Sequence, residues 1–570
     1  MKRQLLVLLL AVCQVFMAVA QKKNPKWMEN VGKAILTVET TSKEGMVKTG
    51  PGFLIHENGE AVASYDLFRK AEKAVAITSG GERLPVTHIF GADDMYNVVR
   101  FKVVVPKKTV YLPVAAVSPA IQSMATLPPS KEEAKFVQGA ITEISKISSV
   151  YDYFKIEMPL PQSQVGFPLL TETGEVFAIA QADAAGKGFT YGLSIAYIQN
   201  LQTTATDIFK KTFTEIGIRN AWSSSIEEAR ITLLLYSSQQ DAPTYLETLS
   251  DFIAAFPNSA EGYVSRASHY AYQRKQLAST VNEQQQMLDK AMMDLETAAK
   301  LTKNKGEGFY NKAKIIFGVV ANDSVLSYKN FTLKSAEENL QKAIKEANLP
   351  LYWQLEGDIA FFQNNFEKAY QSYAMVNSSP EANGTSYYLA AKSKQQLEGT
   401  PLLEIIALMD SAIAKSPNME ASEYLLESID LKLQLGLYDQ VVKDYDKYLL
   451  LTGGKVSDAF YYYREQAKFR TGDLEGALKD IDMALILDNK NALYFAEQAS
   501  VYLRMGNMVK AQASIEKAIQ LEPEFASAYR ILGVCLVRQD KKPEACTHFK
   551  RAIELGDPVA ERLLNENCKE

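Results

Sequence analysis

Side chains that commonly carry catalysis or bind metals are scarce in this chain. Four histidines, His56, His88, His269 and His548, occur among 570 residues, and they lie far apart in the sequence. The sequence contains no His-Glu-x-x-His motif, no glycine-rich phosphate loop and no cluster of cysteine with histidine. A zinc site needs several such ligands close together. We therefore expect neither a metal site nor a cofactor.

The most regular polar feature is a set of arginines near the C-terminal end. Arg470, Arg504 and Arg538 are 34 residues apart, and alanines recur in step with them. Apolar residues four and seven positions after each alanine give the spacing of one buried helix face. A glycine or aspartate five positions before each alanine indicates a turn between two helices. The positions are Gly472, Ala477, Ile481 and Ala484; Gly506, Ala511, Ile515 and Ala518; and Asp540, Ala545, Phe549 and Ala552.

This pattern resembles the tetratricopeptide repeat family, in which helix pairs stack into a solenoid. The resemblance is strongest over 457–556. Earlier spacing is looser, with 46 residues from Tyr245 to Ala291 and 45 from Ala291 to Ala336. The resemblance implies an all-α solenoid of about nine helix pairs over 222–570. We expect lengthened helices or inserted loops in its earlier part.

The resemblance also implies a protein-binding groove on the inner face of the stack. It places Arg470, Arg504 and Arg538 on the groove side, in the last turn of the first helix of each pair, together with Tyr462 and Phe469. A row of arginines suits acidic side chains or a C-terminal carboxylate of a protein or peptide partner. A local role is the alternative, because a cation is also favoured at a helix C-terminus.

Residues 30–205 have no helical periodicity. Short β-rich runs such as Ala34 to Val38 and Val98 to Val105 alternate with turn signals such as Asn58-Gly59 and Gly80-Gly81. Short, regularly spaced strands over this length predict a barrel or a pair of barrels. We expect residues 206–221 to link this domain to the helices.

Several motifs in this region resemble bacterial trypsin-like serine proteases of the HtrA type. They occur in the order of that family over 45–200, and the resemblance implies an all-β trypsin-like double barrel before the solenoid. The motifs are Thr49-Gly50-Pro51-Gly52-Phe53-Leu54-Ile55, Glu57-Asn58-Gly59, Gly91-Ala92-Asp93, Gly166-Phe167-Pro168-Leu169-Leu170 and Tyr191-Gly192-Leu193-Ser194-Ile195.

The catalytic triad of that family is missing from this sequence. The family needs a Ser nucleophile, a His base and an Asp that orients the His. The matching positions hold Val165, Asp66 and Asn97, respectively. Phe167 replaces a glycine of the oxyanion turn, and its bulk disfavours the backbone geometry that binds an oxyanion. We therefore predict a protease-like domain without proteolytic activity.

The N-terminus predicts export. Basic residues precede an apolar run from Leu5 to Val19, and Ala18-Val19-Ala20 offers small residues for cleavage, so residues 1–20 have the pattern of a secretory signal peptide. Lipid attachment at Cys13 is the alternative, which the bulk of Val12 disfavours. No second apolar segment of membrane-spanning length follows. We expect a periplasmic protein, with attachment to the envelope left open.

The net charge is −5 and the sequence has no long basic run, which argues against binding to nucleic acid. Asp323-Ser324-Val325 and Asp410-Ser411-Ala412 resemble the Asp-Ser/Thr-apolar acceptor sites of exported Bacteroidetes glycoproteins. Such tripeptides are common by chance, and Ser411 falls within an expected helix.

Three cysteines remain after the expected cleavage site: Cys535, Cys546 and Cys568. Their spacing matches no zinc pattern. An exported protein can form disulfides, and Cys535 and Cys546 fall on the two helices of one pair, so a bridge between them is feasible. The alternative is that they are buried small apolar residues.

Two classes of function remain open from the sequence. The first is a non-enzymatic exported scaffold or adaptor that binds a protein or peptide partner through the helical groove and uses the degenerate protease-like domain for docking. The second is a serine-protease-like hydrolase or regulator that captures peptides through the N-terminal domain. The missing triad favours the first. A nucleophile within hydrogen-bond reach of a base would favour the second.

Overall fold

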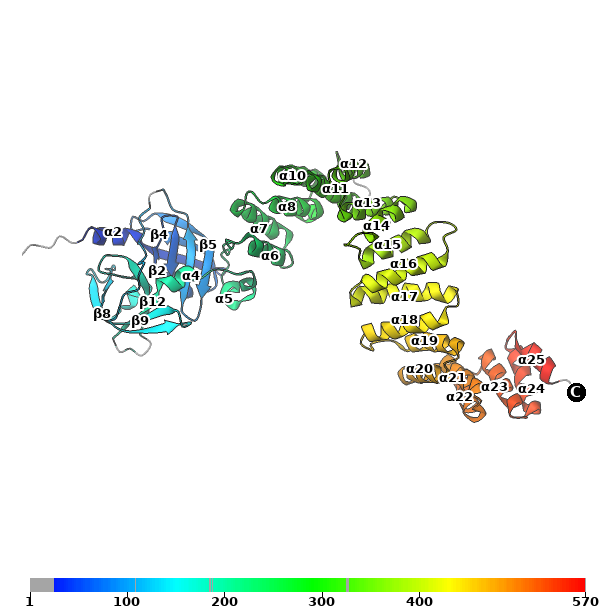
Figure 1. Cartoon of the computed structure of the whole chain (residues 1–570). Helices are drawn as coiled ribbons and strands as arrows, with labels where there is room; N and C mark the ends of the chain where they lie inside the picture. Colours follow the sequence, from blue (N-terminus) through cyan, green and yellow to red (C-terminus); the bar gives the residue numbers. More distant parts are fainter. Residues whose placement is uncertain (1–24, 108, 184–185, 187, 324–327, 569–570) are drawn as a thin grey trace, which may run out of the picture. The chain divides into compact units, whose positions relative to one another are not determined.

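The computed structural model describes residues 25–568 apart from 108, 184–185, 187 and 324–327. The expected signal peptide, the alternative lipid attachment at Cys13 and the acceptor Ser324 lie outside these residues. The chain forms two compact units, Met1–Ser279 and Thr280–Glu570. The first contains all the strands of the described residues, coloured blue to cyan in Figure 1, and the second is helical. Within the described part of the chain, no helix is both long and apolar enough to cross a membrane.

The first six strands close into an antiparallel barrel with the order β1-β2-β3-β6-β5-β4, and β4 pairs back onto β1. Inward and outward side chains alternate, so Leu36 and Val38 of β1 are buried on either side of exposed Thr37. The rings of Phe68 and Phe101 lie 4.9 Å apart inside the barrel. The strands are β1 (Ile35–Ser42), β2 (Val47–Leu54), β3 (Glu60–Ala63), β4 (Ala71–Ile77), β5 (Arg83–Asp93) and β6 (Val98–Val103).

The next six strands repeat this arrangement. Read around the ring, their order β7-β8-β9-β12-β11-β10 matches that of the first barrel position by position. Buried apolar side chains from both barrels, among them Phe53, Val62, Leu170 and Leu193, form one cluster that joins them. This arrangement confirms the expected trypsin-like double barrel. The strands are β7 (Met124–Leu127), β8 (Val137–Ile147), β9 (Tyr151–Glu157), β10 (Pro168–Leu170), β11 (Val176–Ala182) and β12 (Thr190–Ser194).

Residues 206–221, expected to be a linker, are part of the first barrel instead. Phe213 and Ile218 belong to its buried core. The N–H of Ile89 in β5 donates to the carbonyl of Arg219 at 2.8 Å, and the N–H of Ala221 donates to the carbonyl of Ile89 at 2.7 Å. The apolar side chains of this segment explain the difference, because their burial favours packing over a free connection. The segment includes most of η2 (Ala205–Phe209) and all of α5 (Lys211–Thr214).

Helices follow to the end of the chain. Those of the first unit are α6 (Ile226–Ser237), α7 (Ala242–Ala255), α8 (Ala260–Tyr272) and α9 (Arg274–Leu277). Those of the second unit are α10 (Val281–Leu301), α11 (Lys305–Asn322), α12 (Leu333–Glu346), α13 (Pro350–Phe362), α14 (Phe366–Asn377), α15 (Gly384–Gln395), α16 (Leu402–Lys415), α17 (Asn418–Gln434), α18 (Tyr438–Leu451), α19 (Asp458–Thr471), α20 (Leu474–Leu487), α21 (Ala492–Arg504), α22 (Met508–Leu521), α23 (Ala526–Arg538), α24 (Lys542–Glu554) and α25 (Ala560–Asn567).

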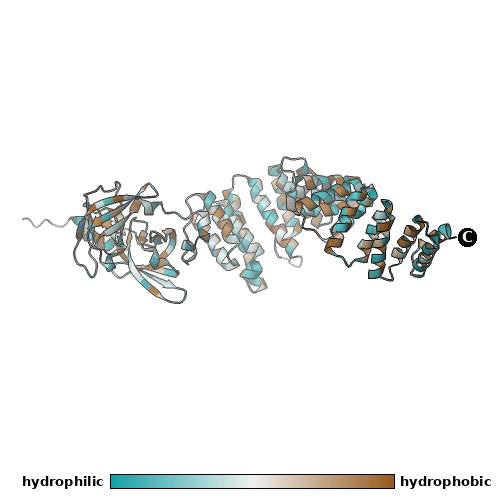
Figure 2. Cartoon of the chain, turned by 90° about the horizontal axis from the view of Figure 1, so that it is seen from below, coloured by the Kyte–Doolittle hydropathy of each residue, from teal (hydrophilic) through white to brown (hydrophobic). Residues whose placement is uncertain are grey.

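From α11 to α24, successive helices pack as pairs in the manner of tetratricopeptide repeats. Apolar residues of these helices are buried, among them Ala477, Ile481 and Ala484 of α20. Figure 2 shows hydrophobic and hydrophilic residues interspersed along each helix. The longer intervals near residue 300 come from longer helices and a longer connection. Helix α10 has 21 residues and α11 has 18, against 13 or 14 in α19 to α24, and residues 323–332 separate α11 from α12.

The 34-residue pattern has a physical basis at two positions of each repeat. Ala477, Ala511 and Ala545 are completely buried, where small side chains let paired helices approach closely. The turn residues Gly472, Gly506 and Asp540 have φ angles of 88°, 81° and 59°. All three end a first helix in the left-handed region, which glycine adopts most easily.

The disulfide joins Cys546 to Cys568, so the expected feasible pair, Cys535 with Cys546, does not form. Cys535 is free and buried, and its thiol donates to the carbonyl of Met508 at 3.3 Å. The observed bond ties the end of α25 to α24, and Leu563 of α25 packs against the core of the last repeats.

Candidate functional site

Two of the three residues that the sequence resemblance matches to a catalytic triad contact each other. Oδ1 of Asn97 accepts a hydrogen bond from the backbone N–H of Asp66 at 2.9 Å. Asp66 stands in the first turn of α3 (Tyr65–Phe68), so the Asn97 side chain satisfies one of the open N–H groups at the start of this helix. The Asp66 carboxylate itself points to solvent, 62% exposed, and pairs with Arg69 at 3.2 Å. The hydrogen bond between Asn97 and Asp66 therefore stabilises the start of α3.

The third position, Val165, follows the short helical turn η1 (Gln162–Gln164). The next residue, Gly166, has a φ of 88°, and a side chain there would come within 3.1 Å of the Ser64 hydroxyl. The turn of the second barrel therefore lies against the first barrel, two residues from Asp66. We call Asp66, Asn97 and Val165 the degenerate site.

Four successive N–H groups of this turn, from Gln164 to Phe167, donate within the barrel in the observed conformation. An oxyanion hole needs N–H groups directed at the substrate. Here the N–H of Gln164 donates to Pro161 at 2.9 Å, and that of Val165 donates to Gln162 at 3.4 Å. The N–H of Gly166 donates to Ala180 at 2.8 Å, and that of the next residue donates to Gln164 at 3.1 Å. The turn uses these donors internally.

The histidines have structural partners. Nε2 of His88 lies 3.1 Å from Oδ2 of Asp251 in α7, and Nδ1 of His56 accepts from the N–H of Asn58 at 3.1 Å. Nε2 of His269 lies 2.8 Å from the carbonyl of Ala242. Within the described part of the chain, no histidine hydrogen-bonds to a serine, threonine or cysteine side chain, and no three His, Cys, Asp or Glu residues form a metal-binding group.

Asp251 of α7 contacts His88 of β5 and so connects α7 to the first barrel. Burial raises its pKa, but hydrogen bonds from His88 and from Trp222 Nε1, together with the charges of His88 and Arg219, outweigh burial and hold the pKa of Asp251 below its usual value. Two pockets flank this carboxylate. One, of about 520 Å³, is also lined by His88, Lys102, Ser223 and Ser224. The hydroxyl of Ser223 donates to Glu228 at 2.7 Å and not to His88.

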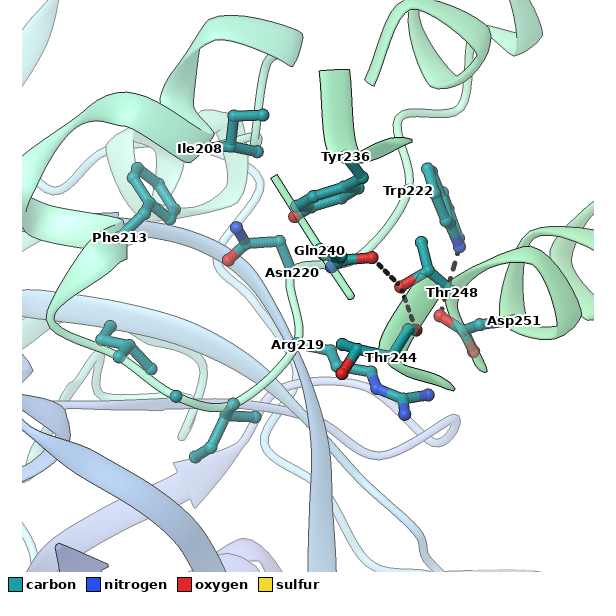
Figure 3. A pocket seen from close by; sticks show the side chains of 13 residues that line it. Ile208, Phe213, Arg219, Asn220, Trp222, Tyr236, Gln240, Thr244, Thr248 and Asp251 are labelled. Carbon is teal, nitrogen blue, oxygen red and sulfur yellow. Dashed lines mark hydrogen bonds between the residues drawn. The ribbon is translucent and has the colours of Figure 1, made fainter. Parts of the chain in front are cut away.

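The other pocket, of about 290 Å³, lies between the end of the first barrel, α6 and α7 (Figure 3). We call it the junction pocket. Tyr236 and Trp222 lie along one side of it, and Gln240, Thr248 and Asp251 lie together at one end. Oε1 of Gln240 accepts from the hydroxyl of Thr248 at 2.8 Å. The pocket could not be predicted from the sequence, because half of its lining comes from the segment expected to be a linker.

The recurring arginines have unequal surroundings. Nη1 of Arg504 donates to the carbonyl of Phe469 at 2.5 Å, and its guanidinium lies 4.7 Å from the centre of that ring. Nη1 of Arg538 donates in the same way to Leu503 at 2.9 Å. Each of these two arginines thus holds the end of the preceding first helix. Within the described residues, Arg470 makes no hydrogen bond or ion pair.

A buried acid lies beside Tyr462. Glu465 is completely buried, and burial together with the charge of Glu497 raises its pKa to about 8. Its Oε2 accepts from Gln466 at 2.7 Å, whereas Oε1 has no partner. Glu465 was not among the residues predicted from the sequence. The repeat alignment does mark it as unusual, because the positions 34 and 68 residues later hold the small residues Ala499 and Gly533.

Comparisons with known proteins support the helical assignment. A family model described as a tetratricopeptide repeat matches residues 497–560. The small glutamine-rich tetratricopeptide repeat-containing protein of Dictyostelium discoideum is 34% identical over 89 residues, which cover 16% of this chain and 27% of that protein. Hsp70-Hsp90 organizing protein 1 of Glycine max is 30% identical over 105 residues, 18% of each chain. The chain therefore spans a small part of either relative.

Among solved structures, a serine endoprotease from Yersinia pestis is similar, with 16% identity and a TM-score of 0.26 over 33% of this chain and 65% of that one. The double-barrel assignment itself rests on the strand order. Strand order, paired helices and the repeat match define the class: a trypsin-like double barrel followed by tetratricopeptide-like helical repeats.

Proposed function

We propose that this protein is an exported, non-enzymatic adaptor. In this proposal the helical repeats bind a segment of a partner protein, and the protease-like double barrel serves for docking without cleaving peptides. The observation that carries the second part is the degenerate site. Val165 has no nucleophilic atom, Asn97 holds the start of a helix, and the N–H groups of the adjoining turn bond within the barrel.

The binding surface we propose is the groove around Arg470 and Tyr462. Arg504 and Arg538 each donate a hydrogen bond to a carbonyl of the preceding repeat. Arg470 is therefore the arginine best placed to bind an acidic group of a partner. The ring of Tyr462 lies 5.5 Å from that of Tyr494 and is tilted by 33° against it, and tyrosine side chains contribute strongly to protein interfaces.

Export to the periplasm is part of the same proposal. The sequence pattern at residues 1–20 supports it, and so does the disulfide between Cys546 and Cys568, since such bonds persist mainly in oxidising compartments. Fractionation of cells that produce the full chain, with mass spectrometry of the mature N-terminus, tests it. Retention of residues 1–20 in a cytoplasmic fraction would contradict export.

Proteolysis is tested with the purified chain and casein or a reduced, unfolded substrate. We expect no cleavage above buffer. A general serine-protease inhibitor identifies contaminating serine proteases, and a metal chelator identifies contaminating metalloproteases. Cleavage that persists with both reagents and copurifies with the chain at constant specific activity would overturn the non-enzymatic assignment.

Partner binding is tested with a photo-crosslinking amino acid at Tyr462 in the groove and, as a matched control, at exposed Lys479 on α20. We expect specific crosslinks from position 462 alone. Arg470→Glu should reduce them at least tenfold without changing the melting temperature. Equal crosslinks from both positions, or full crosslinking with Arg470→Glu, would contradict binding in this groove.

A further inference from the structure

The junction pocket offers a binding site that is separate from the degenerate site and from the helical groove. Its volume of about 290 Å³ lies near the lower end of ligand pockets, which start at about 300 Å³. This space suits one or two residues of a peptide. All of its lining residues belong to the first compact unit.

One end of the junction pocket is apolar. Four side chains from the segment before α6 line it, and each keeps 6 or 7% of its surface accessible although the rest is buried. An aliphatic side chain that enters this end would remove apolar surface from water on both partners. These lining residues are Ile208, Phe213, Ile216 and Ile218.

The other end is polar, and its charged groups already have partners. Arg219 pairs with Glu247, and Oδ2 of Asp251 lies 3.1 Å from Nε2 of His88 and accepts a hydrogen bond from Trp222. Gln240 uses its Oε1 to accept from Thr248, while its Nε2 donates no hydrogen bond within the described residues. An amide N–H near paired charges favours a neutral acceptor such as a peptide carbonyl.

We propose that the junction pocket binds an aliphatic residue of a peptide together with the adjoining peptide group. The aliphatic side chain packs between Ile208 and Phe213, and its peptide carbonyl accepts from Nε2 of Gln240. Trp222 and Tyr236 cover the ligand from one side, as their place in Figure 3 allows. The site stands independently of partner binding in the groove.

The test uses the full chain and a defined probe, N-acetyl-leucine N-methylamide, which carries one aliphatic side chain between two peptide groups. Trp222 lines the pocket, and replacing Trp27 and Trp353 by Phe makes it the sole tryptophan of the chain. We expect a saturable change in its fluorescence. The glycine analogue of the probe should bind at least tenfold more weakly, and so should N-acetyl-leucine with its free carboxylate.

Variants locate the binding. Gln240→Leu removes the amide at similar size and should weaken binding about tenfold. Thr244→Phe extends a ring into the pocket from the exposed start of α7 and should abolish binding, whereas Thr297→Phe on α10 is the matched control and should not change it. Circular dichroism checks folding. No saturation with the probe, equal binding of the glycine analogue, or unchanged binding by folded Gln240→Leu would overturn the proposal.

Discussion

The turn beside the degenerate site and the interface between the last repeats both bury polar atoms that lack partners, but the atoms differ in kind. At the turn they are the hydroxyl of Ser163 and Oε1 of Gln164, which are neutral at any ordinary pH. Between the repeats the atom belongs to the carboxyl group of Glu465. Burial of a neutral polar group lowers the free energy of unfolding by the same amount at every pH. Burial of a carboxyl group raises its pKa, so its effect on the free energy of unfolding changes with pH. The two regions should therefore differ in how their stability depends on pH.

Glu465→Gln should produce the largest effect. The pKa of Glu465 in the folded chain, about 8, is above its usual value of 4.5, so the fold loses stability as pH rises from about 4.5 to about 8. At about 1.4 kcal/mol per pH unit, the free energy of unfolding is lower by roughly 3 kcal/mol at pH 7 than at low pH. The amide variant should be more stable by up to this amount at pH 7 and equal to the parent near pH 4. Urea unfolding at a series of pH values measures it. A gain that is the same at pH 4 and pH 8 would contradict the buried acid.

Asn97→Ala should destabilise the double barrel by about 1 kcal/mol, because it removes the acceptor for the N–H of Asp66 at the start of α3. The loss should be the same at pH 5 and pH 8, in contrast to the repeats. Asn97→Asp keeps an acceptor oxygen and serves as the control. Denaturant unfolding of both variants measures the difference. If the two variants lost equal stability, the hydrogen bond would not be the cause.

Arg504→Ala should cost about 1 kcal/mol through loss of its hydrogen bond to the carbonyl of Phe469. Arg470→Ala, which changes the same residue type one repeat earlier, should leave stability unchanged. Hydrogen exchange at the end of α19 reports the loss locally. Equal destabilisation by both substitutions would assign a structural role to Arg470 and weaken its assignment to partner binding.

Ser163→Ala should stabilise the double barrel slightly, by 1 kcal/mol or less, because it removes a buried hydroxyl that has no partner. The gain should not vary with pH. Thermal unfolding at pH 5 and pH 8 tests this. A loss of stability instead would show that the hydroxyl has a partner, such as a bound water.

Much of this architecture could be predicted from the sequence, because local rules and the global fold agree there. The positions of Gly472, Gly506 and Asp540 marked turns that need a left-handed residue, and the alanines marked close helix contacts. The motifs around Phe53 and Gly166 indicated the double barrel correctly. In these places the residue type follows directly from backbone geometry or from packing.

The remaining features depend on contacts between distant residues. Phe213 and Ile218 lie in a segment that the sequence predicts to be a linker, and only their contacts with the first barrel make them core residues. The partner of Cys546 depends on where α25 folds back, which spacing does not reveal. The junction pocket combines the segment before α6 with residues of α6, α7 and the turn between them, so no local motif indicates it.

The pairing of β5 with the segment before α6 has a mechanical consequence. The chain leaves the first barrel through hydrogen bonds between Ile89 and residues 219 and 221, in a parallel arrangement, with Phe213 anchored in the core behind them. Tension applied through α6 would load these hydrogen bonds and the buried Phe213 before it reached the rest of the barrel. The first barrel and the start of α6 should therefore resist a pull together.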